Sequence, residues 1–222
     1  MQQNYLNRRH CIVLAANLAG SGIFGSVAIA ATQPERRAHT LLVLGDSLSA
    51  EYGLKRGTGW VALLEQKLQA EKIKAQVVNA SISGDTTLGG RTRLAALLVQ
   101  HQPTLVVIEL GGNDALRGLP LDLTRDNLLA MTRLAQQSGA RVVLLGMQVP
   151  PNYGRDYAQR FARMYAEVAK ATQAALVPFF LKGIADAPDS MAWFQADRIH
   201  PREDAHPRML ANVWPTLKKG LQ

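Results

Sequence analysis

The stretch Leu41-Leu42-Val43-Leu44-Gly45-Asp46-Ser47-Leu48-Ser49 decides how the rest of the sequence is interpreted. Its four branched apolar residues are typical of a short strand buried on both faces, as in the centre of a parallel sheet. The run stops at Gly45-Asp46-Ser47, and a helical pattern begins near Trp60. Ligands of open α/β sheets bind beyond the carboxyl ends of the strands, which is where Ser47 is placed. Taken alone, Gly-Asp-Ser is equally compatible with an ordinary turn, because all three residues favour turns.

Apolar runs alternate with helical patterns along the rest of the chain. Strands are predicted at Thr40–Leu44, Ala75–Asn79, Leu105–Leu110, Val142–Met147 and Ala175–Phe180. Helices are predicted at Trp60–Glu71, Leu88–Gln100, Leu123–Gln137 and Tyr157–Gln173. Strict alternation of this kind indicates an α/β fold, with a five-stranded parallel sheet covered by helices on both faces. The 222 residues leave room for one such domain, and no internal repeat or second linker divides it.

Residues 1–30 have the features of a secretory signal peptide. A basic start is followed by an apolar stretch at residues 11–30, and Ala28-Ile29-Ala30 satisfies the small-x-small rule for cleavage. We therefore expect cleavage near this triplet, a periplasmic or secreted protein, a linker over residues 31–39 and the folded domain over residues 40–222. The alternative is an uncleaved membrane anchor, although Gly and Ser residues dilute the apolar stretch.

Cysteine content and charge argue against several kinds of site. The only cysteine, Cys11, lies in the expected signal peptide, so the mature chain has no thiol for disulfides, catalysis or thiolate metal sites. The net charge of +8 comes from scattered basic residues without basic blocks, which indicates a solvated basic surface and no nucleic-acid partner. Such a surface allows at most transient contact with anionic lipid. Neither the P-loop glycine motif nor the dinucleotide-binding glycine motif follows a strand, so no phosphate-binding loop is predicted. We expect a monomer without cofactor or metal.

Polar residues gather where the predicted strands end. The four groups are Gly45-Asp46-Ser47, Ser83-Gly84-Asp85, Gly111-Gly112-Asn113-Asp114 and Asp197-Arg198-Ile199-His200-Pro201. The carboxyl ends of parallel strands meet at one edge of a sheet. We therefore expect these four groups to open onto a common site.

The residue types in these groups match the needs of acyl transfer. A nucleophilic serine needs a base, the base needs an acid that orients it, and the developing oxyanion needs fixed hydrogen-bond donors. Ser47 is the candidate nucleophile, His200 the candidate base and Asp197 its orienting partner. The N–H groups of Ser47 and Gly84 and the side-chain amide of Asn113 are the candidate oxyanion donors.

Other polar residues in these regions are assigned structural roles. We expect Asp46 and Asp114 to brace loops by accepting backbone N–H hydrogen bonds. His206 is placed in the first turn of a helix whose N-cap is Asp204. Arg117 is interpreted as an exposed loop residue, with a substrate contact as the alternative.

Four blocks of the sequence occur in a specific order. They are Gly45-Asp46-Ser47-Leu48-Ser49, Asn79-Ala80-Ser81-Ile82-Ser83-Gly84-Asp85-Thr86, Glu109-Leu110-Gly111-Gly112-Asn113-Asp114 and Asp197-x-x-His200-Pro201. Together they resemble the four blocks of the SGNH hydrolases, the GDSL esterases and lipases, and within them the bacterial thioesterase I, lysophospholipase and arylesterase group. The resemblance implies a flavodoxin-like three-layer α/β/α sandwich and hydrolysis through an acyl-serine. It assigns the triad to Ser47, Asp197 and His200, and the oxyanion hole to Ser47, Gly84 and Asn113.

The resemblance also implies where a substrate binds. In such relatives the loops after the third and fourth strands line the acyl pocket, and their apolar members here are Leu116, Leu119, Val149 and Pro150. The implied substrates are aryl and short-to-medium acyl esters, with lysophospholipids and thioesters as neighbouring substrates. Glu51 departs from the thioesterase relatives, which carry glycine there. A carboxylate at the pocket rim could disfavour anionic substrates such as acyl-CoA.

Three alternatives stay open on the sequence. A carbohydrate acetylesterase would use the same triad, because one fold and one triad serve many substrates. A metal-dependent phosphoesterase would also gather hard ligands at strand ends, and here they would be Asp46, Asp85, Asn113, Asp114, Asp197 and His200. A non-catalytic binding module would keep the fold without the reaction.

Overall fold

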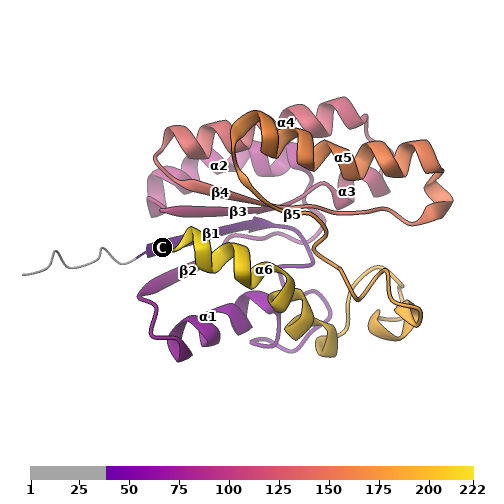
Figure 1. The fold of residues 1–222 in the computed structure, drawn as a ribbon, viewed down its shortest axis with the longest axis horizontal. Coiled ribbons are helices and arrows are strands. Elements are labelled where there is room, and N and C mark those ends of the chain that lie inside the picture. Colours follow the sequence, from indigo (N-terminus) through magenta and orange to yellow (C-terminus); the bar gives the residue numbers. More distant parts are fainter. Residues whose placement is uncertain (1–38) are drawn as a thin grey trace, which may run out of the picture. The chain divides into compact units, whose positions relative to one another are not determined.

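The computed structural model describes residues 39–222 (Figure 1). The expected signal peptide at residues 1–30 and the expected linker up to residue 38 lie outside the described residues. His39, which the sequence assigns to the linker, already belongs to the first strand and pairs with Ala75.

Five parallel strands form the sheet in the order β2-β1-β3-β4-β5. Their bounds are β1 His39–Gly45, β2 Ala75–Asn79, β3 Leu105–Glu109, β4 Arg141–Leu145 and β5 Ala175–Val177. This is the flavodoxin-like order of doubly wound α/β folds, so the predicted fold class is confirmed. The direction of winding reverses between β1 and β3. The crevice beyond the carboxyl ends of these two strands is therefore the expected place for a ligand.

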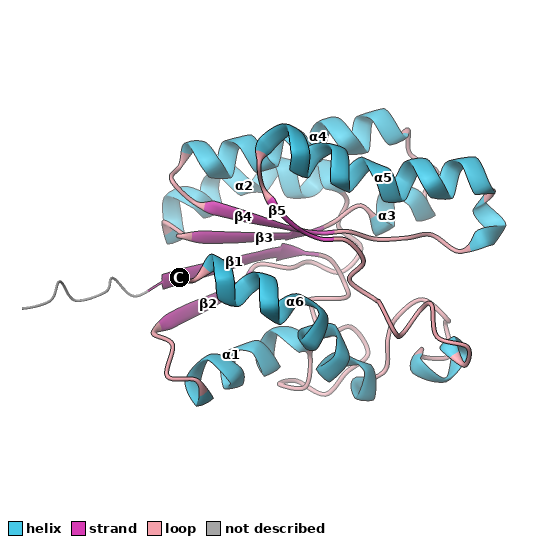
Figure 2. Cartoon of the chain, viewed as in Figure 1, coloured by secondary structure: helices cyan, strands magenta, loops and turns pink. Residues whose placement is uncertain are grey.

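Helices cover both faces of the sheet (Figure 2). The helices α1 Trp60–Ala70 and α6 His206–Gly220 lie on one face, and α2 Thr87–His101, α4 Leu121–Gln137 and α5 Arg155–Thr172 lie on the other. Short elements complete the description, namely α3 Gly112–Leu116 and the 3-10 turns η1 Pro151–Tyr153, η2 Ser190–Trp193 and η3 Glu203–Ala205. Among the helices of residues 39–222, none is both long and apolar enough to span a bilayer.

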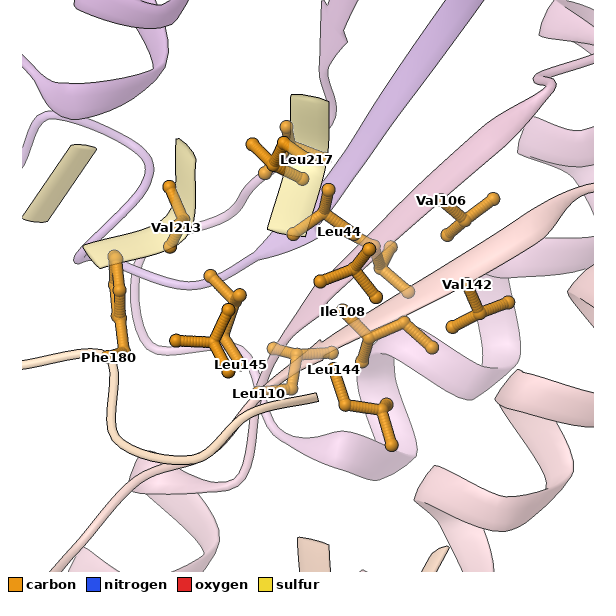
Figure 3. Close-up of a cluster of buried hydrophobic side chains, with 14 of the residues drawn as sticks. Leu44, Val106, Ile108, Leu110, Val142, Leu144, Leu145, Phe180, Val213 and Leu217 are labelled. Atoms are coloured by element: carbon orange, nitrogen blue, oxygen red, sulfur yellow. The ribbon is translucent and has the colours of Figure 1, made fainter. Parts of the chain in front are cut away.

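The core lies on both faces of the sheet because the central strands carry continuous apolar runs, Leu41–Leu44 in β1 and Leu105–Ile108 in β3. Val106 and Val142 project on one side, whereas Val213 and Leu217 of α6 approach from the other (Figure 3). All four side chains are buried. Burial on both faces is what a continuous branched run, rather than an alternating one, predicts for a parallel strand.

Most element bounds differ from the predicted ones by one or two residues, and two differences have a clear physical cause. The last strand ends at Val177, not at Phe180, because Pro178 has no N–H for the ladder and the chain turns until Phe180 donates to the Gly146 carbonyl at 2.8 Å. The N-cap prediction for Asp204 is wrong. The 3-10 turn η3 runs directly into α6, so Ala205 is the N-cap and Asp204 lies inside the turn.

His206 joins the two helices on one face of the sheet. Its Nδ1 accepts a hydrogen bond of 3.0 Å from the Trp60 backbone N–H at the start of α1, and its ring also hydrogen-bonds the Pro201 backbone. The side chain is buried, and this burial lowers the pKa of His206 from 6.5 to about 4. The ring is therefore a neutral acceptor at neutral pH, since protonation of Nδ1 would remove the bond to Trp60.

We predict that His206 makes the folded state less stable in mild acid. Between pH 6.5 and 4 the unfolded chain binds a proton at this residue that the folded chain excludes, so stability falls as pH drops. From pH 7.5 to 5 the expected loss is about 2 kcal/mol. In His206→Asn the amide oxygen can still accept from Trp60 but does not titrate, so this part of the loss should vanish. Urea denaturation of both proteins at the two pH values measures it, and equal losses would contradict the assignment.

Candidate active site

The polar groups at the strand ends converge at the carboxyl edge of the sheet. Ser47 Oγ lies 2.9 Å from His200 Nε2, although the two residues are 153 positions apart in the chain. On the other side of the ring, His200 Nδ1 lies 2.6 Å from Asp197 Oδ2. When a hydroxyl, an imidazole and a carboxylate are hydrogen-bonded in this order, the imidazole can take the proton of the serine.

The loop that carries Asp197 also stabilises the ionised form of its carboxylate. Asp197 Oδ1 accepts hydrogen bonds from the backbone N–H groups of Ile199, at 2.9 Å, and His200, at 3.0 Å. Desolvation pushes the pKa of Asp197 upward, but these bonds and the one to the His200 ring outweigh it and lower the pKa to about 2. An ionised partner at Nδ1 fixes the imidazole with its free Nε2 facing Ser47.

A tight turn after β1 presents Ser47. The N–H groups of Ser49 and Ala50 donate to the Asp46 carbonyl, and the Leu48 N–H donates to Asp46 Oδ1 at 3.0 Å. Asp46 therefore braces the turn from below. Its side chain is only 3 % exposed, and burial raises the pKa of Asp46 to about 6 despite the hydrogen bonds that favour the charged form.

Asn113 is held on α3, the short helix that follows β3. Gly111 precedes it with φ +117°, and a Cβ there would collide with the hydroxyl of Tyr165, so the entry to this helix requires glycine. Asn113 Nδ2 donates to Asp46 Oδ2 at 2.9 Å and to the Asp85 carbonyl at 3.0 Å. Both amide hydrogens therefore have acceptors, and donation to an oxyanion has to share or replace one of these bonds.

Gly84 lies on the loop after β2, which is tied to its neighbours on two sides. The N–H of Ile82 in this loop donates to the Gly45 carbonyl at 3.0 Å. The Arg117 guanidinium donates to the Gly84 carbonyl at 2.7 Å. Arg117 is therefore more than an exposed loop residue, because it links the second polar group to the segment after α3.

An apolar cleft of about 320 Å³ opens beside Ser47 and His200. Leu116, Val149 and Pro150 line it, as the resemblance implies, but Leu119 does not. The chain turns at Gly118, with φ +66°, after α3 has ended, and this turn carries Leu119 away from the cleft. Further walls come from residues that sequence patterns mark only as core or loop, namely Met147, Tyr153, Phe161, Leu181, Phe194 and Ile199.

Glu51 does not form the expected charged rim. Its carboxylate accepts hydrogen bonds from the Gly57 N–H at 3.0 Å and the Gly59 N–H at 2.8 Å, and so closes its own loop. The next residue, Tyr52, packs on His200 with ring centroids 4.3 Å apart. Sequence reasoning missed Tyr52, because its contact depends on how the loop folds back and not on any local pattern.

The acidic residues near the site have partners other than a metal. Asp85 pairs with Arg93 at 2.8 Å, and Asp114 accepts hydrogen bonds from Thr87 and Thr124. Over residues 39–222, no group of three or more His, Cys, Asp or Glu side chains is arranged to hold a metal ion. Asp85 and Asp114 are thus bound to neighbouring side chains within the protein.

Comparisons with known proteins identify relatives of this chain. Residues 43–208 match the model of the GDSL-like lipase/acylhydrolase family. The chain is 52 % identical over 194 residues to "Esterase TesA" of Pseudomonas aeruginosa, covering 87 % of this chain and 95 % of that protein. It is 45 % identical over 170 residues to "Thioesterase 1/protease 1/lysophospholipase L1" of Escherichia coli, covering 77 % and 79 %.

A solved structure shares the fold and most of the chain. The psychrotrophic esterase EstA from Pseudoalteromonas sp., inhibited by monoethylphosphonate, superposes with a TM-score of 0.77 at 42 % identity, and the match covers 82 % of this chain and 98 % of that one. The family match spans the segments that carry Ser47, Gly84, Asn113, Asp197 and His200. The chain belongs to the GDSL-like lipase/acylhydrolase family.

Proposed function

We propose that the protein hydrolyses carboxylic esters through an acyl-enzyme formed on Ser47. The observation that carries this proposal is the hydrogen bond of 2.9 Å between Ser47 Oγ and His200 Nε2 at the mouth of an apolar cleft. A base within hydrogen-bond reach of a hydroxyl, and itself oriented by a carboxylate, is the arrangement that activates a serine.

The reaction follows from the positions of these groups. Ser47 Oγ attacks the ester carbonyl while His200 takes its proton, and the carbonyl oxygen becomes an oxyanion beside the Ser47 and Gly84 N–H groups and the Asn113 amide. When the tetrahedral intermediate collapses, His200 gives the proton to the leaving alkoxide. Water then attacks the acyl-serine with His200 as base, which releases the acid and restores the serine.

The walls of the cleft indicate the class of substrate. Because most of its lining is apolar, it suits the hydrocarbon part of an aryl or short-to-medium acyl ester better than an acetylated sugar. Lysophospholipid and thioester cleavage are neighbouring activities, supported by the name of the Escherichia coli relative. Glu51 gives no reason to exclude anionic leaving groups, since its carboxylate is bound within its own loop.

The N-terminal sequence supports export of the enzyme. The basic start, the apolar stretch and the small-x-small triplet are the parts of a cleavable signal. The protein then works as a monomer in the periplasm or outside the cell, on small-molecule esters and without cofactor or metal. Its basic surface allows transient contact with anionic lipid, where lysophospholipids are found.

We predict that Ser47→Ala abolishes hydrolysis without unfolding the protein. Loss of the nucleophile should lower kcat for p-nitrophenyl butyrate by about 10⁴-fold or more. Circular dichroism and the unfolding midpoint serve as the folding control, and a chelator is added to the wild type in parallel. Activity that survives the substitution would refute the nucleophile, and activity lost to the chelator would favour the metal-dependent phosphoesterase alternative.

We predict that Asn113→Ala lowers kcat much more than it changes KM. The oxyanion exists only in the transition state, so the loss of one donor should cost about 100- to 1,000-fold in kcat. Steady-state kinetics on the same ester measure both constants. An effect confined to KM would mean that the amide binds substrate and not the transition state.

We predict that Val149→Ala changes the preference for acyl chain length. Val149 lines the cleft, and removing two methyl groups should lower kcat/KM for p-nitrophenyl octanoate about fivefold relative to the acetate. Leu119→Ala is the matched control, because Leu119 lies outside the cleft and should leave this ratio unchanged. Equal effects of the two substitutions would argue against the assigned acyl site.

A further inference from the structure

A buried acid lies directly beneath the nucleophile turn and takes no part in the proposed reaction. Glu109 ends β3, and its side chain is 1 % exposed. Its Oε2 accepts hydrogen bonds from Ser49 Oγ at 2.8 Å and from the Asp46 N–H at 3.3 Å. The Trp60 indole donates to the same Ser49 oxygen at 3.1 Å, so the acid anchors a small network between β3, the turn and α1.

The surroundings of Glu109 favour its neutral form. None of the ion pairs formed within residues 39–222 includes it. The titratable groups that face it are Asp46, whose backbone N–H donates to Glu109 Oε2 at 3.3 Å, and Tyr165, whose hydroxyl donates to the Leu110 carbonyl at 3.0 Å. His200 is near enough to Asp46 to lower the pKa of that carboxyl, although burial raises it more. Burial, followed by the charge of Asp46, raises the pKa of Glu109 well above its ordinary range.

The strand next to Glu109 leaves room for this acid. A Cβ on Gly45 would lie 2.9 Å from Glu109 Oε2 and 2.8 Å from Ser49 Oγ, closer than a real side chain could approach. A larger residue at position 45 would therefore displace the side chains of Ser49 and Glu109. The buried carboxyl keeps its hydrogen-bond partners only while this space is free, because a buried polar group without a partner is costly.

The network continues from Glu109 to the oxyanion site. The Asp46 N–H donates to Glu109 Oε2 at 3.3 Å, and Asp46 Oδ2 accepts a hydrogen bond from the Asn113 amide at 2.9 Å. We propose that Glu109 is a positioning residue that, as a neutral carboxylic acid, donates a hydrogen bond to Asp46 and thereby holds the oxygen that orients the Asn113 amide. The inference rests on the proposed function for the role of Asn113. No proton leaves the Glu109–Asp46 pair during the catalytic cycle.

Two substitutions separate this role from simple packing. In Glu109→Gln the amide oxygen can accept from Ser49 and Asp46 while the amide N–H₂ donates to the Asp46 carboxylate, so the network should persist. In Glu109→Leu the side chain can neither accept hydrogen bonds from Ser49 and the Asp46 N–H nor donate one to the Asp46 carboxylate. The Asp46 carboxyl then remains buried with one hydrogen-bond partner fewer. Val107→Ala on the same strand is the matched control for lost core packing, because Val107 is buried in β3 away from the cleft.

Steady-state kinetics on p-nitrophenyl butyrate test the positioning role. We expect Glu109→Leu to lower kcat by 10- to 100-fold with KM within twofold, Glu109→Gln to retain kcat within threefold, and Val107→Ala to retain kcat. Combined with Asn113→Ala, Glu109→Leu should cause little further loss, because both act on one amide. Retention of kcat in Glu109→Leu, or a loss that multiplies with that of Asn113→Ala, would overturn the proposal.

Infrared spectroscopy tests the protonation state without relying on activity or on the leucine variant. At pH 8 we expect the wild type and Ser47→Ala to show a carboxylic-acid C=O band that is absent in Glu109→Gln. If the wild type lacks the band, the acid form and the proposal are wrong. If Ser47→Ala keeps its esterase activity while the band is present, the proposed function fails and the state assigned to Glu109 stands.

Discussion

The candidate site depends on one contact of 2.9 Å, between Ser47 and His200, which joins loops at opposite ends of the domain sequence. Neither loop could hold this distance by itself, because loops are mobile unless a scaffold fixes their ends. The parallel sheet supplies the scaffold, since β1 lies at its centre and β3 beside it, and all carboxyl ends face one edge. The apolar core on both faces of the sheet thus determines the geometry of a polar site outside it (Figure 3).

The polar layer between core and cleft meets a second constraint, which is that buried polar groups need partners. Asp46, Asp114 and Glu109 are all nearly inaccessible, and each accepts hydrogen bonds from neighbouring backbone or hydroxyl groups. A buried carboxyl without a hydrogen-bond partner would cost several kcal/mol of stability. Replacing one residue of this layer therefore also destabilises the residues that are hydrogen-bonded to it. The same bonds hold the turn of Ser47 and the amide of Asn113. Stability and geometry of the site therefore rest on one network.

Segments outside this hydrogen-bond network shape the surroundings of His200 and the walls of the cleft. Glu51 closes its own loop through Gly57 and Gly59, and that loop places Tyr52 against the ring of His200. Residues from α5 and from the segment after β5 close the apolar cleft. Family membership accounts for the shared machinery. The cleft walls and this loop are where an esterase of this fold can acquire its own substrate preference.

The sequence by itself determined the strands, most of the helices and the polar groups at the strand ends, because hydrophobic period and residue type are local properties. The strand β2, for instance, covers the residues predicted for it. Only the tertiary structure decided that Leu119 turns away from the cleft, that the Glu51 carboxylate folds back onto its loop and that Glu109 lies beneath Ser47. Each of these depends on the path of the chain after an element ends. That path is set by contacts between segments far apart in sequence, which no local pattern contains.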